Sequence, residues 1–247
     1  MKEQVVDITT PDGAMNTHIL HPDGDGSFPV VLFYMDSVGV REELLDMCRR
    51  IASVGYYVAL PNLYYRTTPC FDIDADRIGD PAYGDRAAEL WKLVRSLTNT
   101  KVADDTRAIL RFLQQEPAAG PGKVGIVGHC MSGRFVFHLA GAFPDRVGAA
   151  ASFYGASFVS DATDSAHLLA GQIKGELYFG WAEHDSYVPA DMIGKLRQVI
   201  EQHKLNARIE TYPQSHHGFA FPTRHAYDKQ SAERHWERLF DMWRRNL

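Results

Sequence analysis

The sequence has no long hydrophobic run and no surplus of positive charge. Its longest apolar stretch is residues 28–35, and even this contains Pro29, whereas a membrane-spanning helix needs about 20 apolar residues. The 26 Lys and Arg residues are outnumbered by 31 Asp and Glu, giving a net charge of −5. A nucleic-acid-binding protein would need a basic surplus or a basic stripe. We therefore expect neither a membrane protein nor a nucleic-acid-binding protein.

Cysteine is scarce as well. The three cysteines, Cys48, Cys70 and Cys130, are an odd number and lie far apart in the chain. This pattern argues against a disulfide framework and is typical of a reducing compartment. The N-terminus has no apolar segment of the kind found in signal peptides. We therefore expect a cytoplasmic protein whose thiols are available for chemistry.

The 247 residues, 45% of them hydrophobic and 23% charged, are enough for a single α/β domain spanning residues 1–247. Strand patterns occur at residues 5–9, 15–20, 29–35, 56–60, 123–127, 147–154, 176–179 and 208–212. Helical periodicity occurs at residues 44–51, 86–97, 102–113, 134–142, 192–200 and 236–243. This alternation predicts a mostly parallel central sheet with helices on both faces.

A glycine-flanked turn between a strand and a helix carries the first chemical signal. The sequence Gly-His-Cys-Met-Ser-Gly at 128–133 follows the strand at 123–127. A nucleophile elbow has the pattern G-x-Nu-x-G, with small residues two positions before and after the nucleophile because the backbone turns tightly there. Gly128 and Ser132 occupy those positions, so Cys130 is the predicted nucleophile. Cys48 instead lies on the apolar face of a helix, and Cys70 lies in an irregular segment without a base beside it.

A nucleophile needs a base and an orienting acid, which in this topology follow it in the order acid, then histidine. Asp185 follows the strand at 176–179 and is the leading acid, with Glu183 in the same loop as an alternative. His216 and His217 both follow the strand at 208–212. The order of a cysteine, an acid and a histidine therefore fits a catalytic triad.

These motifs together resemble the dienelactone hydrolase family. The resemblance rests on the cysteine elbow, on an Asp three residues before Val188-Pro189, and on the His-Gly-Phe sequence at 217–219. The segments 36–66 and 123–133 are also similar, so the resemblance runs from about residue 28 to the final helix. It implies an α/β-hydrolase fold and a Cys130, His217 and Asp185 triad. It favours His217 over His216 because the family histidine directly precedes the Gly-Phe step.

The implied activity is hydrolysis of an ester or lactone, of the carboxymethylenebutenolidase type, through a thioester acyl-enzyme. Backbone N–H groups of Ser37 and Met131 would form the oxyanion hole. The resemblance also places an acidic residue near the resting thiol, here Asp36. Further candidates for substrate binding are Trp91, Tyr64, Phe219 and Phe221. No cofactor is expected, and no metal, because His184, Asp185 and His217 lack the spacing of metal ligands.

The family's substrate-gripping arginines have no counterparts at the corresponding positions, which are Gly84 and Phe221 here. Arg66, Arg86 or Arg224 could replace them from elsewhere. We therefore expect a neutral small-molecule ester or lactone to be a better substrate than dienelactone. Alternative functions are a non-catalytic small-molecule-binding scaffold, a thioesterase, a peptidase or a metal-dependent hydrolase. The sequence leaves open whether the protein is a monomer or a small homo-oligomer.

Overall fold

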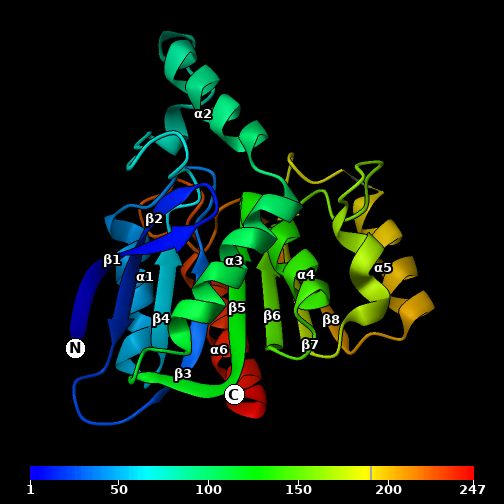
Figure 1. The fold of residues 1–247 in the computed structure, drawn as a ribbon. Helices are drawn as coiled ribbons and strands as arrows, with labels where there is room; N and C mark the ends of the chain where they lie inside the picture. Colours follow the sequence, from blue (N-terminus) through cyan, green and yellow to red (C-terminus); the bar gives the residue numbers. More distant parts are fainter. Residues whose placement is uncertain (190) are drawn as a thin grey trace. The chain divides into compact units, whose positions relative to one another are not determined.

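The computed structural model describes residues 1–189 and 191–247, which form two compact units, Met1–Pro121 and Gly122–Leu247. Strands and helices alternate along both units (Figure 1). Of the strand pairings within the units, β3/β4, β5/β6, β6/β7 and β7/β8 are parallel, whereas β1/β2 and β2/β4 are antiparallel. The predicted α/β fold with a mostly parallel sheet is therefore confirmed.

The first unit has its strands in the order β1-β2-β4-β3. The strands are β1 (Lys2–Thr10), β2 (Gly13–His21), β3 (Phe28–Tyr34) and β4 (Tyr57–Pro61). The helices are α1 (Glu42–Ser53), α2 (Gly84–Ser96) and α3 (Asn99–Leu113). Every residue of β4 is buried, which is the pattern of a strand covered on both faces. The segment predicted to be irregular, residues 64–82, contains only short 3₁₀ turns, η1 (Ala75–Arg77) and the start of η2 (Pro81–Tyr83).

The second unit has four parallel strands in the order β5-β6-β7-β8. The strands are β5 (Ala119–His129), β6 (Val147–Phe153), β7 (Glu176–His184) and β8 (Ala207–His216). The helices are α4 (Gly133–Ala142), α5 (Met192–His203) and α6 (Lys229–Asn246), with 3₁₀ turns η3 (Cys130–Ser132) and η4 (Ala166–Gln172). Helices α4 and α6 cover opposite faces of this part of the sheet (Figure 1). This explains why every residue of β6 is buried.

Strands β7 and β8 extend beyond their apolar patterns, which end at residues 179 and 212. Both continue to a histidine, His184 in β7 and His216 in β8, and these two residues are register partners. The last two residues of β7, Glu183 and His184, and most of residues 213–216 in β8 are exposed, so hydrophobic periodicity does not reveal these strand ends. The extension matters because the predicted acid and base directly follow these two strand ends. No helix in the described part of the chain combines the length and apolar character needed to cross a membrane.

Candidate active site

Cys130 occupies the tip of a sharp turn between β5 and α4. Its φ of 53° lies in the left-handed region, which a side chain with a Cβ adopts only at a cost. Gly128 makes the turn possible, because a Cβ there would lie 2.6 Å from the carbonyl oxygen of Ser132. Ser132 itself is fully buried, whereas Cys130 is partly exposed. The turn therefore presents a thiol at the sheet edge where β5 ends.

Asp185 and His217 lie side by side because the strands that precede them are paired. His184 of β7 and His216 of β8 face one another, so the next residue of each strand leaves the sheet at the same place. His217 Nδ1 and Asp185 Oδ2 are 2.8 Å apart. The second carboxylate oxygen of Asp185, Oδ1, accepts a hydrogen bond of 3.0 Å from the backbone N–H of Tyr187. The carboxylate is therefore fixed on both sides and orients the imidazole.

Glu183, the alternative acid, has a different partner. The register between β7 and β8 shifts after Ala182, and Gln214 in the shifted segment has a φ of 56°. The backbone N–H of Gln214 donates a 2.6 Å hydrogen bond to Glu183 Oε2. Glu183 therefore stabilises the irregularity of the strand pair. His216, the alternative base, is exposed, and its ring lies 5.2 Å from that of His184.

The electrostatic environment of His217 favours its charged form. Burial by itself would lower the pKa of this imidazole, whose side chain is only 17% exposed. The negative charge of Cys130, the hydrogen bonds to Asp185 and Cys130, and the charge of Asp185 outweigh burial and raise the pKa to about 10. The imidazole of His217 thus lies between Cys130 and Asp185 and is hydrogen-bonded to both.

Two tyrosines contact the imidazole of His217, and nothing in the sequence is a reason to select the first of them, Tyr154. The ring of Tyr154, which is fully buried, lies 5.0 Å from it, and the ring of Tyr187, which is 54% exposed, lies 4.7 Å from it. Tyr154 has a φ of 39° and ends the predicted strand at 147–154. Hydrophobic patterning identifies such a residue only as core, since a positive φ at a tyrosine is imposed by tertiary packing. Tyr187, in contrast, is one of the aromatic residues that the sequence suggests for the lining of the pocket.

Four of the predicted site residues lie in the first unit. Asp36, which is 1% exposed, accepts hydrogen bonds from the Arg41 guanidinium, the shorter one of 2.8 Å, and from the backbone N–H of Val38 at 3.1 Å. The hydroxyl of Tyr64 donates to the backbone oxygen of Ser37 at 2.8 Å. These bonds fix the loop after β3, whose Ser37 N–H is the predicted oxyanion donor. The fourth residue, Trp91, is partly exposed on α2.

Met131, the second predicted oxyanion donor, follows Cys130 in η3 and is buried. Phe219 and Phe221, from the loop after β8, are also buried, at 0% and 1% exposure. Phe219 stacks on Tyr212 at 4.6 Å, and Phe221 lies 5.2 Å from the ring of His129. Both phenylalanines thus pack beside the residues that carry the candidate nucleophile and base.

Two of the three candidate arginines are engaged in ion pairs. Arg66 forms hydrogen bonds of 2.7 and 2.9 Å with the fully buried carboxylate of Asp105, and it also pairs with Asp12. Arg86 pairs with Glu89 and donates to a backbone oxygen. Arg224 is partly exposed and lies beside Gly218, next to His217.

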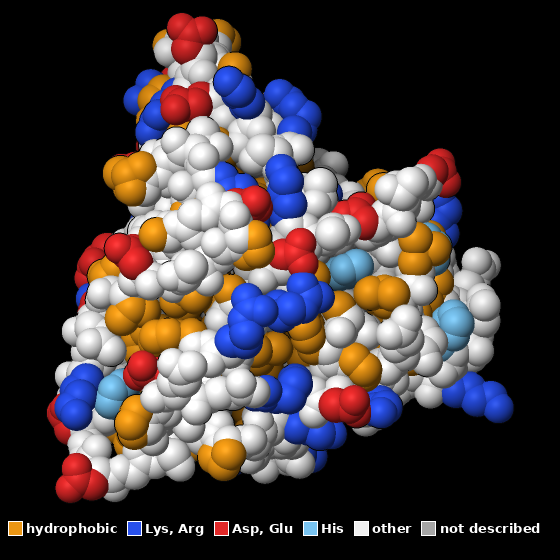
Figure 2. Space-filling model, viewed as in Figure 1, with side chains coloured by type: hydrophobic (Ala, Val, Ile, Leu, Met, Phe, Trp, Pro, Cys, Tyr) orange, Lys and Arg blue, Asp and Glu red, His pale blue; other side chains and the backbone are white. Residues whose placement is uncertain are grey.

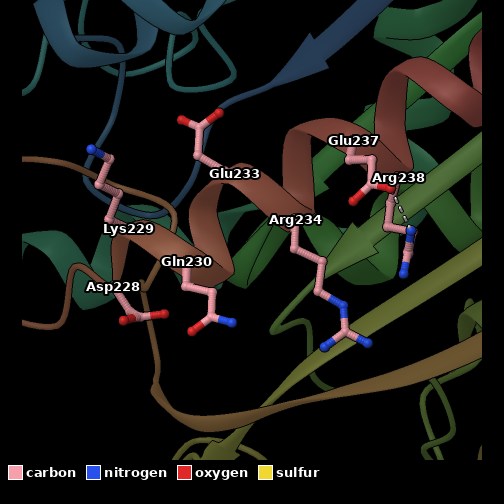
Figure 3. A pocket seen from close by; sticks show the side chains of 7 residues that line it. All are labelled: Asp228, Lys229, Gln230, Glu233, Arg234, Glu237 and Arg238. Carbon is pink, nitrogen blue, oxygen red and sulfur yellow. Dashed lines mark ion pairs between the residues drawn. The ribbon is translucent and has the colours of Figure 1, made fainter.

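A surface hollow of about 820 Å³ follows α6 and is separate from the predicted site residues (Figure 3). It is lined by charged and polar side chains of both signs, from Asp228 to Arg238. Among the described residues, no cluster of three or more His, Cys, Asp and Glu side chains is placed to hold a metal ion. The face drawn in Figure 2 carries acidic and basic side chains interspersed, without a basic stripe among its described residues.

The fold and this arrangement of residues define an α/β-hydrolase, and comparison with solved structures agrees. A structure from Klebsiella pneumoniae named "Putative Dienelactone Hydrolase" superposes with a TM-score of 0.84 at 23% identity, covering 98% of both chains. Dienelactone hydrolase from Anabaena variabilis gives a TM-score of 0.69 at 16% identity, over 100% of this chain and 98% of its own.

The sequence comparisons identify the family of the chain. The model of the dienelactone hydrolase family matches residues 15–247, and the chain belongs to this family. A relative from Synechocystis sp., named "Putative carboxymethylenebutenolidase", is 26% identical over 251 residues, covering 100% of this chain and 98% of the relative. The family resemblance seen in the motifs is therefore confirmed.

Proposed function

We propose that the protein hydrolyses small ester or lactone substrates with Cys130 as nucleophile, His217 as general base and acid, and Asp185 as the orienting carboxylate. The observation that carries this proposal is the continuous series of contacts from Cys130 through His217 to Asp185. A protein that only bound small molecules would gain nothing from this series. The names of the relatives support the same class of reaction.

In the first half of the reaction, the Cys130 thiolate attacks the carbonyl carbon and forms a tetrahedral oxyanion. The backbone N–H groups of Ser37 and Met131 are proposed to stabilise that oxyanion. The C–O bond then breaks, and His217, protonated at the start, gives its proton to the departing alkoxide or enolate. The products of this half-reaction are a thioester acyl-enzyme and a neutral imidazole.

The second half-reaction uses the neutral imidazole. His217 takes a proton from water, the resulting hydroxide attacks the thioester carbonyl, and the C–S bond breaks to release a carboxylic acid. The thiolate and the imidazolium are restored, so the cycle closes without a metal or an organic cofactor. Three scattered thiols fit a cytoplasmic location for this chemistry.

Asp36, which the family resemblance places near the resting thiol, is also bound within its own loop. Its carboxylate is held by the guanidinium of Arg41 and by the N–H of Val38. We propose that it orders the loop that carries the Ser37 N–H. Arg41 in turn also pairs with Glu43, so the loop is fixed by a network of three charged side chains.

Alanine replacement of each cysteine tests the proposed function. We expect Cys130→Ala to lower kcat for an aryl ester by several orders of magnitude, since removal of a covalent nucleophile in other enzymes costs on the order of 10⁶. Cys48→Ala and Cys70→Ala are the matched controls and should retain most activity, because burial raises the pKa of the Cys48 thiol and Cys70 is exposed in the irregular segment of the first unit. Full activity of Cys130→Ala would eliminate the proposal.

A further inference from the structure

The residue directly before the candidate nucleophile belongs to a buried pair of histidines. His129 ends β5 and His235 lies in α6, 106 residues later, and both are 0% exposed. Their Nε2 atoms are 2.9 Å apart, so one imidazole donates its proton and the other accepts it. The two rings are surrounded by the aromatic rings of Phe153, Tyr154, Phe221 and Trp236.

This location makes the pair costly for the fold. Each imidazole loses its hydration inside an aromatic environment, and the hydrogen bond between the two returns only part of that cost. Two apolar rings would fill the same space without this loss. What the imidazoles provide is direction, because a hydrogen bond requires a narrow distance and angle between its two atoms. The pair therefore fixes the position of α6 relative to the end of β5.

Both partners of that contact are connected to the catalytic residues. His129 is joined to Cys130 by a peptide bond at the point where the chain enters the left-handed region. The loop that carries His217 runs directly into α6, and the backbone N–H of Asp228 returns to the oxygen of Phe219 at 3.1 Å. A displacement of α6 would thus move the base, and a displacement of His129 would move the nucleophile.

We infer that His235 is a positioning residue, which acts through His129 to keep the Cys130 sulfur and the His217 imidazole in hydrogen-bonding register. Phe221 supports the same assignment, because it comes from the His217 loop and its ring packs on His129 at 5.2 Å. This inference rests on the proposed function, since it assigns to the pair the alignment of that nucleophile with that base. Of the six rings in the cluster, Tyr154 is the only one besides the histidines that can ionise.

The test measures the reactivity of Cys130 rather than turnover. Iodoacetamide alkylation is followed by peptide mass spectrometry at Cys130 in the full chain, at about pH 6 and about pH 10. Near pH 6 the thiolate depends on the aligned His217 imidazolium, whereas near pH 10 a thiol is ionised without help. We expect His235→Phe to slow alkylation about tenfold or more at the lower pH, since a displacement of 1 Å in a reacting pair can cost about 100-fold. The two proteins should react at nearly equal rates at the higher pH.

Two further substitutions separate positioning from packing. His235→Gln places an amide near the position of Nε2 and should restore most of the lost reactivity, whereas His235→Asn is too short and should not. If His235→Phe fails to fold, the difference between Gln and Asn still decides the question. His138→Phe is the matched control, because His138 is another buried histidine, 7% exposed, on α4 and outside the pair. It should lower the melting temperature without changing the ratio of alkylation rates at the two pH values.

The outcomes distinguish this inference from the proposed function. A wild-type protein whose Cys130 is unreactive near pH 6 would contradict the proposed thiolate–imidazolium pair and, with it, the inference. A reactive wild type with an equally reactive His235→Phe variant would overturn the positioning role alone. Equal losses in His235→Phe and His138→Phe, or equal rates in the Gln and Asn variants, would show a general packing effect and overturn it as well.

Discussion

At the scale of single residues, Cys130 combines backbone strain with a hydrogen bond to His217. A left-handed φ costs an L-amino acid about 1–2 kcal/mol, and here Gly128 and the buried Ser132 keep the turn closed around it. The strain places the sulfur at the strand end next to His217. A substitution that relaxed this turn would stabilise the backbone and misplace the thiol.

The Asp185–His217 contact gives a prediction that separates neighbouring residues. We expect His217→Ala and Asp185→Asn each to reduce kcat strongly, with the Asp185 change the milder one, because orientation of the base is only part of its action. His216→Ala is the matched control, since that exposed ring contacts His184. Circular dichroism should show all three variants folded. A severe loss in His216→Ala with mild effects of the other two would reverse the assignment of the base.

The raised pKa of His217 predicts a pH-dependent contribution to stability. Because the folded-state pKa, about 10, lies above the ordinary 6.5, the charged imidazolium stabilises the fold fully below about pH 6.5. The contribution, on the order of a few kcal/mol, is lost as the pH rises through about 10. The free energy of unfolding of the wild type, measured against that of His217→Gln, should therefore shrink between pH 6.5 and 10. A difference that is constant over this range would contradict the pairing.

How far residues could be assigned from the sequence depended on how local their signal is. Cys130 is recognisable as a candidate nucleophile because its glycine-flanked turn consists of six consecutive residues. His235 is not, because its partner lies 106 residues away and neither histidine stands in a motif of its own. Tyr154 looks like any core tyrosine until the fold forces its φ to be positive and places its ring against His217.

At the scale of elements, β8 and α6 are connected by a buried carboxylate. Glu210 of β8 accepts hydrogen bonds from Arg238 of α6 and from the Tyr178 hydroxyl of β7, and it also pairs with Arg234 and Arg208. Burial would raise the pKa of Glu210, but these hydrogen bonds and positive charges lower it to about 2. The helix that carries His235 is therefore held to the sheet by charge as well as by packing.

Replacement of Glu210 measures how much this connection between β8 and α6 contributes to the stability of the fold. Glu210→Gln leaves several guanidinium groups without their anion and should lower the free energy of unfolding by about 3 kcal/mol. Because the folded-state pKa is lowered, the stabilisation is present above about pH 4.5 and is lost as the pH falls through about 2. Urea titrations at pH 7 and pH 3 should show a smaller difference between the two proteins at pH 3. Glu201→Gln, at an exposed position of α5, is the control and should change little.

Strands and helices could be predicted from the sequence where their burial produces a recognisable hydrophobic pattern. Strands such as β4 and β6 are buried along their whole length, so their apolar runs mark them clearly. The polar ends of β7 and β8 escape this criterion, because their pairing depends on the backbone and on the Glu183–Gln214 bond. The functionally important end of each strand is thus the part that hydrophobicity describes least well.

At the scale of the whole molecule, family membership leaves the substrate to be determined. Arg66 pairs with Asp105 and Asp12, and Arg86 pairs with Glu89. Arg224 lies beside Gly218, next to the candidate base. A carboxylate that enters an aromatic site without a partner loses its hydration at a cost of several kcal/mol. Neutral esters and lactones avoid that cost.

We therefore expect a higher kcat/KM for a neutral aryl ester than for dienelactone of similar size. The measurement compares the two substrates in the wild type and in Arg224→Ala. A tenfold or greater preference for the charged lactone that disappears in Arg224→Ala would contradict the expectation and identify Arg224 as the residue that binds the carboxylate. A preference that persists in the variant would point to another cation.

The pairing of His184 with His216 has a consequence for how this protein could diverge. The spacing of acid and base is set by a backbone ladder, so the loops that follow Asp185 and His217 can change in length and composition without altering it, provided that the Tyr187 N–H and the connection of the His217 loop to α6 are kept. New substrate preferences can arise by loop variation alone. An insertion or deletion of a single residue between 212 and 216, by contrast, would turn the base to the other face of the sheet. Natural variants with altered specificity should therefore carry their length changes after these strand ends and not within them.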